Sequence, residues 1–196
     1  MRLWRTAILS GAVLALAAGT CSASRFEITN ALNGFKGLWT RMNFSGGFGT
    51  VECEVLIEGQ FLRWTNYKLV GLQYGNVLIS EVLRCARGGM TIATETLPWP
   101  ILYRSYTGSL PIPSALSMTI IGMGFRIREP FFGATCTVRP ETSSVILTGG
   151  ITIAGVINSY TISGSNQCSG FNGSVEGTGS ANIQRSTSVR TSIYLI

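Results

Sequence analysis

The chain has 196 residues and a formal net charge of +6, and only 12% of its residues are charged, about half the usual ~25%. It contains no His and no Asp, which excludes a Ser-His-Asp triad, His-dependent metal sites, EF-hand loops and Walker-type magnesium sites. The length favours one domain, and the basic residues are too scattered for a nucleic-acid footprint.

The first 23 residues have the pattern of a signal peptide. Arg2 and Arg5 precede an apolar run at residues 7–19, which is too short to cross a bilayer as a helix. We expect cleavage after residue 23, which leaves a secreted domain of residues 24–196 without a membrane span. That domain keeps thirteen basic and nine acidic residues, a charge of +4.

Cys21 leaves open a second way in which the leader could be processed. Bacterial lipoproteins are cut directly before a cysteine that then carries lipid, and a lipid anchor on Cys21 would hold the protein on the cell surface. Ala18 and Thr20 fit the residue preferences of that cut poorly, so release or another form of surface attachment is the favoured expectation.

Short alternating runs separated by Gly, Asn, Ser and Pro predict antiparallel strands along the first half of the secreted domain. Four apolar side chains alternate with Glu52, Glu54 and Glu58, which places Cys53 on the buried face of its strand. A hairpin turn is expected at Gly59 and another turn at residues 88–89. The predicted strands are residues 50–58, 61–65, 76–85 and 90–95.

Four prolines lie between residues 97 and 113, and proline cannot donate to a central ladder, so this stretch is expected to be an edge strand or a structured loop. An apolar strand follows at 116–128, with a break near Gly122 or Gly124. Later strands are predicted at residues 134–139, 144–148, 151–157, 159–163 and 186–196, with a turn near Asn158, while residues 171–179 are rich in glycine.

These patterns predict an all-β fold of ten to thirteen strands, because no segment after the leader keeps a helical apolar period. An antiparallel β-sandwich is the expected architecture. A division into two β subdomains near residues 113–133 is left open.

Four cysteines remain in the secreted domain, and an even number in an exported chain indicates disulfides. Cys53 and Cys85 are 32 residues apart, as are Cys136 and Cys168. Three pairings are possible, and the equal spacing favours Cys53 with Cys85 and Cys136 with Cys168. It also leaves an internal duplication open. No C-x-x-C pair is present, so we expect no metal, and nothing in the sequence indicates a cofactor.

Three stretches of the chain resemble a set of uncharacterised secreted proteins of soil actinobacteria. They are residues 94–99 (TETLPW), 103–111 (YRSYTGSLP) and 193–196 (IYLI), together with the flanking cysteines. The resemblance implies export, a β-rich fold and paired cysteines. It brings no activity with it.

Aromatic and basic residues in the middle of the chain are candidates for a ligand platform. Rings can stack on sugars, and an arginine adds a hydrogen-bonding fork. The expected ligand is an extracellular polysaccharide or the cell wall. The alternative is that these rings cover the edges of the core. The candidates are Trp64, Tyr67, Trp99, Tyr103, Arg104 and Tyr106.

The sequence therefore predicts a secreted or cell-surface protein that acts as a binding or structural module and is not an enzyme. One alternative is a glycoside hydrolase, because two of the glutamates at positions 52, 54 and 58 could act as a catalytic carboxylate pair. A small outer-membrane-type barrel is a second alternative, although four cysteines and the proline-rich centre fit it poorly.

Overall fold

The computed structural model describes residues 25–28, 34–47, 49–63, 65–108, 113–128, 135–147, 152–163, 172–180 and 193–195. Within these ranges the secondary structure consists of antiparallel strands and one short 3-10 helix, η1 (Thr94–Thr96). The all-β antiparallel fold is therefore confirmed. The expected signal peptide lies outside the described residues.

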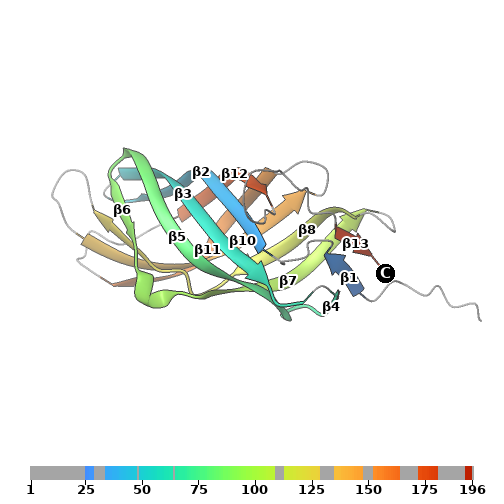
Figure 1. Cartoon of the computed structure of the whole chain (residues 1–196). Coiled ribbons are helices and arrows are strands. Elements are labelled where there is room, and N and C mark those ends of the chain that lie inside the picture. The colour runs from blue at the N-terminus through green and yellow to red at the C-terminus, as the bar shows by residue number, and fades with distance from the viewer. Residues whose placement is uncertain are drawn as a thin grey trace, which may run out of the picture.

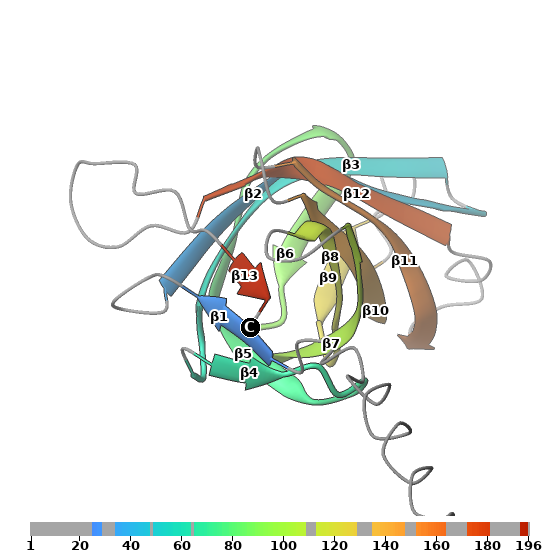
Figure 2. The same cartoon turned by 90° about the vertical axis from the view of Figure 1, so that its right-hand side faces the viewer.

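Eight strands in the described part of the chain pair in a ring, each antiparallel to its neighbours. The last strand of the ring pairs with the first, so the sheet closes on itself as a barrel (Figures 1 and 2). The expected sandwich is not confirmed, because its two sheets would not be joined by ladders on both sides. The strands are β2 (Gly34–Gly46), β3 (Gly49–Phe61), β5 (Gln73–Arg87), β7 (Trp99–Gly108), β8 (Pro113–Ile120), β10 (Thr135–Leu147), β11 (Thr152–Ser163) and β12 (Asn172–Ser180).

Two short strands extend the ring at one end. β9 (Phe125–Arg128) continues the line of β8 along β10, and β6 (Gly89–Ile92) pairs with β9. The predicted break between β8 and β9 is confirmed at Gly122, whose φ of +74° glycine adopts without a Cβ penalty. The ladders of the ring thus run through the region near 113–133, where a subdomain boundary had been left open.

A separate three-stranded sheet lies across the other end of the barrel. It consists of β13 (Ile193–Leu195), β1 (Arg25–Ile28) and β4 (Thr65–Tyr67), in that order. Figure 1 places these strands beyond one end of the ring, and Figure 2 shows them in front of its opening. Of the predicted strand at 186–196, residues 193–195 are described and form β13.

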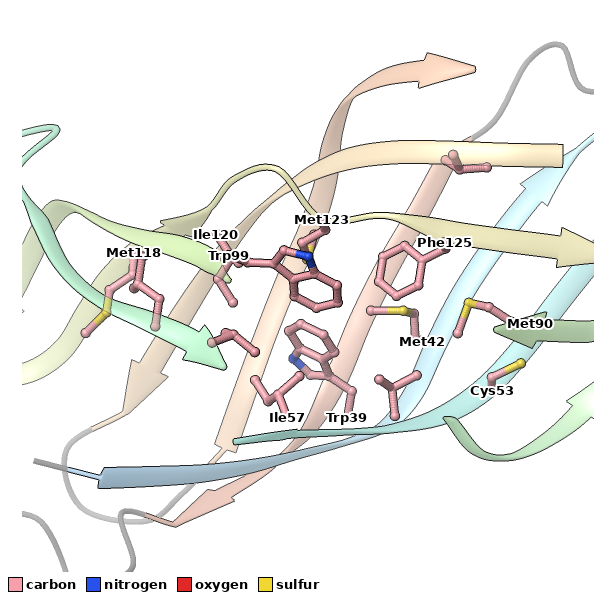
Figure 3. Packing of buried hydrophobic residues seen from close by; sticks show 14 of the residues in the cluster. Trp39, Met42, Cys53, Ile57, Met90, Trp99, Met118, Ile120, Met123 and Phe125 are labelled. Carbon is pink, nitrogen blue, oxygen red and sulfur yellow. The ribbon is translucent and has the colours of Figure 1, made fainter. Parts of the chain in front are cut away.

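Apolar side chains fill the inside of the barrel (Figure 3). The predicted alternation in β3 is confirmed, since Val51, Cys53, Val55 and Ile57 are buried while the three glutamates lie on the opposite face. Trp39 and Trp99 are both fully buried, and Phe125 lies between Trp99 and Phe44 with ring centroids 5.5 and 5.6 Å away. Within the described residues, no helix has the length and apolar character needed to span a membrane.

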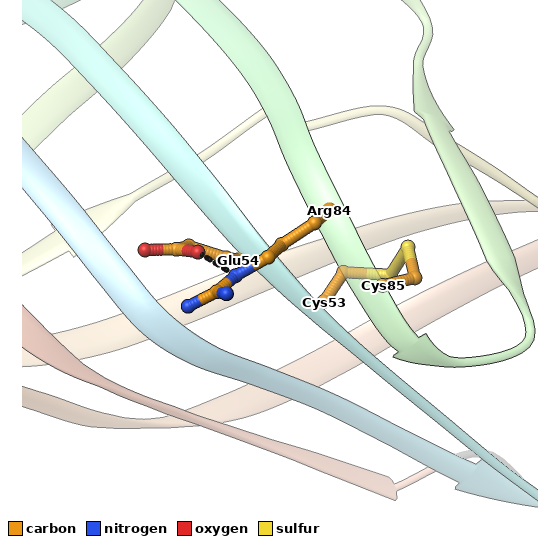
Figure 4. Close-up of a disulfide and its surroundings, with 4 residues drawn as sticks. All are labelled: Cys53, Glu54, Arg84 and Cys85. Atoms are coloured by element: carbon orange, nitrogen blue, oxygen red, sulfur yellow. Dashed lines mark hydrogen bonds and ion pairs between the residues drawn. A yellow bond between two sulfur atoms is a disulfide. The ribbon is translucent and has the colours of Figure 1, made fainter.

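The disulfide between Cys53 and Cys85 is confirmed (Figure 4). The two residues are directly opposite each other on β3 and β5, and their sulfur atoms are 2.01 Å apart. Cys136 is also disulfide-bonded, whereas Cys168, its expected partner, lies outside the described residues.

The predicted hairpin turn at Gly59 is wrong, because β3 runs through this residue to Phe61. A Cβ at position 59 would collide with the carbonyl oxygen of Asn76 and with the ring of Phe35. Glycine is needed here for close approach of two strands and not for a turn.

Two other predictions are also corrected. The proline-rich stretch at 97–113 is expected from the sequence to be an edge strand or a loop, but β7 lies inside the sheet between β5 and β8. Pro100 is the second residue of β7 and Pro113 is the first residue of β8, so the residues after Pro100 keep their amides for pairing. The turn near Asn158 is wrong as well, since β11 continues past it. The irregularity there is a bulge in β11 opposite Pro140 and Glu141 of β10, and the two strands are paired on both sides of it.

Candidate functional site

The connection between β4 and β5 forms a fixed turn at the end of the barrel that carries the small sheet. We call residues 67–72 the tip. The amide of Leu72 donates to the carbonyl of Leu69 at 2.9 Å, and Gly71 between them has a φ of +83°, as the third position of a type II turn requires. Gly71 N also donates to Tyr103 O at 2.8 Å, and Tyr103 N donates to Leu72 O at 3.0 Å. Backbone hydrogen bonds therefore fasten the tip to β7.

The side chains at the apex of this turn are apolar and face solvent. Leu69 is 60% exposed and Val70 is 70% exposed, and Leu62, Tyr67 and Leu72 around them are exposed as well. Turn positions are ordinarily occupied by Gly, Pro, Asn, Asp or Ser. An apolar apex that the backbone holds outward is therefore a candidate contact surface.

Three basic side chains lie on or next to the tip at defined positions. Arg25 donates to the Tyr67 hydroxyl at 2.9 Å and lies 4.6 Å from the centre of that ring. Lys68 Nζ lies 4.7 Å from the centre of the Tyr106 ring. Arg104 is exposed and directly follows Tyr103, whose backbone binds the tip. Its Nε donates to Thr119 Oγ1 at 2.8 Å. Such cation–π contacts hold the charges near the rings, each by about 0.5–1 kcal/mol at exposed sites.

A pair of buried tyrosines supports the tip from inside the barrel. Tyr74 and Tyr103 stack with ring centroids 5.1 Å apart, and the Tyr74 hydroxyl donates to Tyr67 O at 2.7 Å. Burial raises the pKa of Tyr74, with a smaller contribution from Tyr103. Burial also raises the pKa of Tyr103, with a smaller contribution from Tyr106. Both phenols are therefore held in the neutral form.

These raised pKa values make the folded state sensitive to alkali. The unfolded chain releases the phenol protons near an ordinary pKa of about 10, whereas the folded chain retains them to higher pH. The free energy of unfolding should therefore be unaffected by these groups below about pH 10 and should fall above it, by up to about 1.4 kcal/mol per pH unit for each tyrosine. Urea unfolding between neutral pH and pH 11 measures this fall.

Tyr74→Phe should flatten the alkaline fall, because the substitution removes one of the linked protons. Tyr67→Phe is the matched control, since Tyr67 is 44% exposed, and it should leave the slope unchanged. Equal slopes for the wild type and Tyr74→Phe would contradict the assignment.

The structure separates five of the six predicted ligand residues into two groups. Tyr67 is part of the tip, and Arg104 and Tyr106 lie next to it. Trp99 is fully buried and Tyr103 is 4% exposed, both inside the barrel, so neither belongs to an exposed aromatic strip. Trp64 lies outside the described residues.

The three glutamates of β3 face outward and each has a cation on a neighbouring strand. Glu58 pairs with Lys36 at 2.6 Å, Glu52 with Arg41 at 3.5 Å, and Glu54 with Arg84 at 2.5 Å (Figure 4). This arrangement is the one expected of a solvated strand face, where cross-strand pairs of opposite charge are favourable.

Four site residues were missed by sequence reasoning: Arg25, Lys68, Leu69 and Val70. The apolar pair is followed by a glycine and preceded by Lys68, which is a usable turn signal with unusual side chains at its apex. Arg25 could not be assigned from local pattern, because it reaches the site through pairing of β1 with β4, opposite Tyr67.

The described residues contain no cluster of three or more acidic or cysteine side chains that could hold a metal ion. The structure describes a closed antiparallel all-β protein. At one end of the barrel it carries a turn with an apolar apex and basic side chains around it. The chain matches no protein-family model, no curated protein and no solved structure.

Proposed function

We propose that this chain is an exported, non-catalytic binding module of the cell surface, and that it holds an anionic partner at the barrel end that carries the tip. One observation carries the proposal: an exposed apolar turn, fixed by backbone hydrogen bonds, is flanked by Arg25, Lys68 and Arg104. The Cys53–Cys85 disulfide supports export, because disulfides persist in oxidising compartments.

The partner is an anionic polymer or surface of the cell envelope. An extracellular polysaccharide or the cell wall was the ligand expected from the sequence, and it remains a candidate in its acidic forms. Neutral sugars have less support, because Arg25 and Lys68 lie against the rings of Tyr67 and Tyr106 that would otherwise stack on a sugar.

Two features favour this function over the alternatives. The paired glutamates of β3 lie on the outer, solvated side of the barrel and are not set facing each other across a cleft, which supports a non-enzymatic role. Apolar side chains fill the inside of the barrel and ion pairs cover part of its outside, whereas strands that face lipid have the opposite pattern.

Binding of the full chain to cell envelopes tests the proposal. We expect retention on envelopes and on acidic but not neutral polysaccharide or lipid surfaces, with weaker binding at higher salt. Lys68→Gln with Arg104→Gln should weaken binding roughly thirtyfold, because each of the two basic side chains contributes about 1 kcal/mol near an anionic surface.

Lys36→Gln with Arg84→Gln is the matched control, because it removes the same charge from ion pairs on β2 and β5. Binding of this control should stay close to that of the wild type. The proposal fails if the wild type does not bind envelopes, or if the two double variants bind equally.

A further inference from the structure

The apex of the tip has the features of an element that inserts into the apolar part of a partner. Leu69 and Val70 project from a turn that backbone hydrogen bonds fix to β7, so neither residue can fold back onto the core without breaking those bonds. Both side chains are more than half exposed, and removing such apolar surface from water is favourable in free energy. A partner with an apolar interior would recover part of that free energy.

The charges around the apex complement an anionic surface. Arg25 and Lys68 lie against the rings of Tyr67 and Tyr106, and Arg104 adjoins Tyr103, whose backbone binds the tip. Glu27 is on β1 opposite Thr65. An exposed apolar apex next to tyrosines and long basic side chains has the composition of a membrane-interface element, because rings and cations are favoured at headgroup level.

The first described strand begins at the tip end of the barrel. β1 starts at Arg25, opposite Tyr67, and the Arg25 side chain lies against the Tyr67 ring. A charge from another part of the chain is therefore held next to the tip.

A second exposed apolar group on the barrel does not share these features. Leu78, Ile79 and Leu83 lie on β5, whose pairing with β3 is interrupted by three register shifts. Such bulges turn extra side chains outward, and the acidic Glu81 lies among these residues. This group therefore serves as an apolar control surface.

We propose that the tip docks on an anionic phospholipid surface, with Leu69 and Val70 at the boundary between headgroups and acyl chains and Arg25, Lys68 and Arg104 on the headgroups. This inference rests on the proposed function, and it names the partner at that site. An acidic polysaccharide is the rival partner, and the experiment below distinguishes the two.

Flotation of the full chain with vesicles tests the docking. We expect binding to vesicles that combine phosphatidylcholine with phosphatidylglycerol and little binding to phosphatidylcholine alone. Leu69→Ser with Val70→Ser should lower binding at least about tenfold, because two buried apolar side chains are lost. Leu78→Ser with Ile79→Ser is the matched control and should bind as the wild type does. Near-UV circular dichroism checks that both variants fold.

Each outcome decides between the proposals. Equal vesicle binding by the wild type and the Leu69→Ser, Val70→Ser variant overturns tip docking, because another part of the chain then drives it. Binding to soluble acidic polysaccharide without vesicle binding overturns the lipid partner and keeps the proposed function. Absence of binding to vesicles, polysaccharide and envelopes overturns both.

Discussion

Replacing Trp99 with alanine is expected to lower the free energy of unfolding by about 3–5 kcal/mol, the usual cost of removing a buried tryptophan. The indole is fully buried, lies against Phe125 with ring centroids 5.5 Å apart, and donates from Nε1 to Thr96 Oγ1 at 2.8 Å (Figure 3). The substitution leaves a cavity in the barrel and removes the donor from the Thr96 hydroxyl. Urea unfolding at neutral pH measures the loss.

Two further variants make this result interpretable. Trp99→Phe keeps a ring in the cavity and should cost less than the alanine variant, so it remains measurable if the alanine variant does not fold. Tyr67→Ala removes a ring that is 44% exposed and should cost little stability. A Trp99→Ala protein that is as stable as the wild type but defective in envelope binding would contradict a core role for Trp99 and would indicate a role in ligand binding.

Replacing both Cys53 and Cys85 with alanine should lower the free energy of unfolding by about 3–4 kcal/mol, because the disulfide closes a loop of intermediate length in the unfolded chain. The two residues are 32 positions apart and join β3 to β5 side by side. Cys53 is almost fully buried, so alanine is preferred to serine, which would bury a hydroxyl.

Reductant supplies the control for the double variant. Reduction should destabilise the wild type more than the Cys53→Ala, Cys85→Ala protein, because the variant has only the disulfide of Cys136 left to lose among the described cysteines. Loss of less than about 1 kcal/mol in the double variant, or equal responses to reductant, would contradict a structural role for this disulfide.

Local periodicity predicted much of the fold because side chains alternate along a strand whatever its neighbours are. The buried face of β3, the long strand β5 and the break before β9 follow from this pattern. The Cys53–Cys85 pair followed from spacing and an even count. Closure into a barrel did not, because it depends on pairing between β2 and β12, which are far apart in the sequence.

The aromatic and basic residues of β7 do not share one face. Trp99 and Tyr103 point inward, and the exposed Arg104, as the next residue, points outward by ordinary strand alternation. A register shift between Tyr103 and Ser105 then places Tyr106 opposite Leu116, partly buried against the core, and local sequence does not reveal such a shift. Gly59 was misread for a related reason, since the close approach of Asn76 is a tertiary contact.

The tip was not predicted because an apolar pair in a short loop resembles the start of a strand. Its exposure follows from three backbone hydrogen bonds that involve Leu69, Leu72, Gly71 and Tyr103. The contribution of Arg25 likewise depends on pairing between β1 and β4, which local sequence does not reveal.

Peptide mapping of the unreduced protein, collected from the cells that make it, tests most directly the claim that the chain is exported and oxidised into this barrel. Digestion and mass spectrometry should find Cys53 linked to Cys85 and Cys136 linked to Cys168, with an N-terminus at residue 24 or a lipid on Cys21. Free thiols at Cys53 and Cys85, or a link between Cys53 and a cysteine of the other pair, would contradict it.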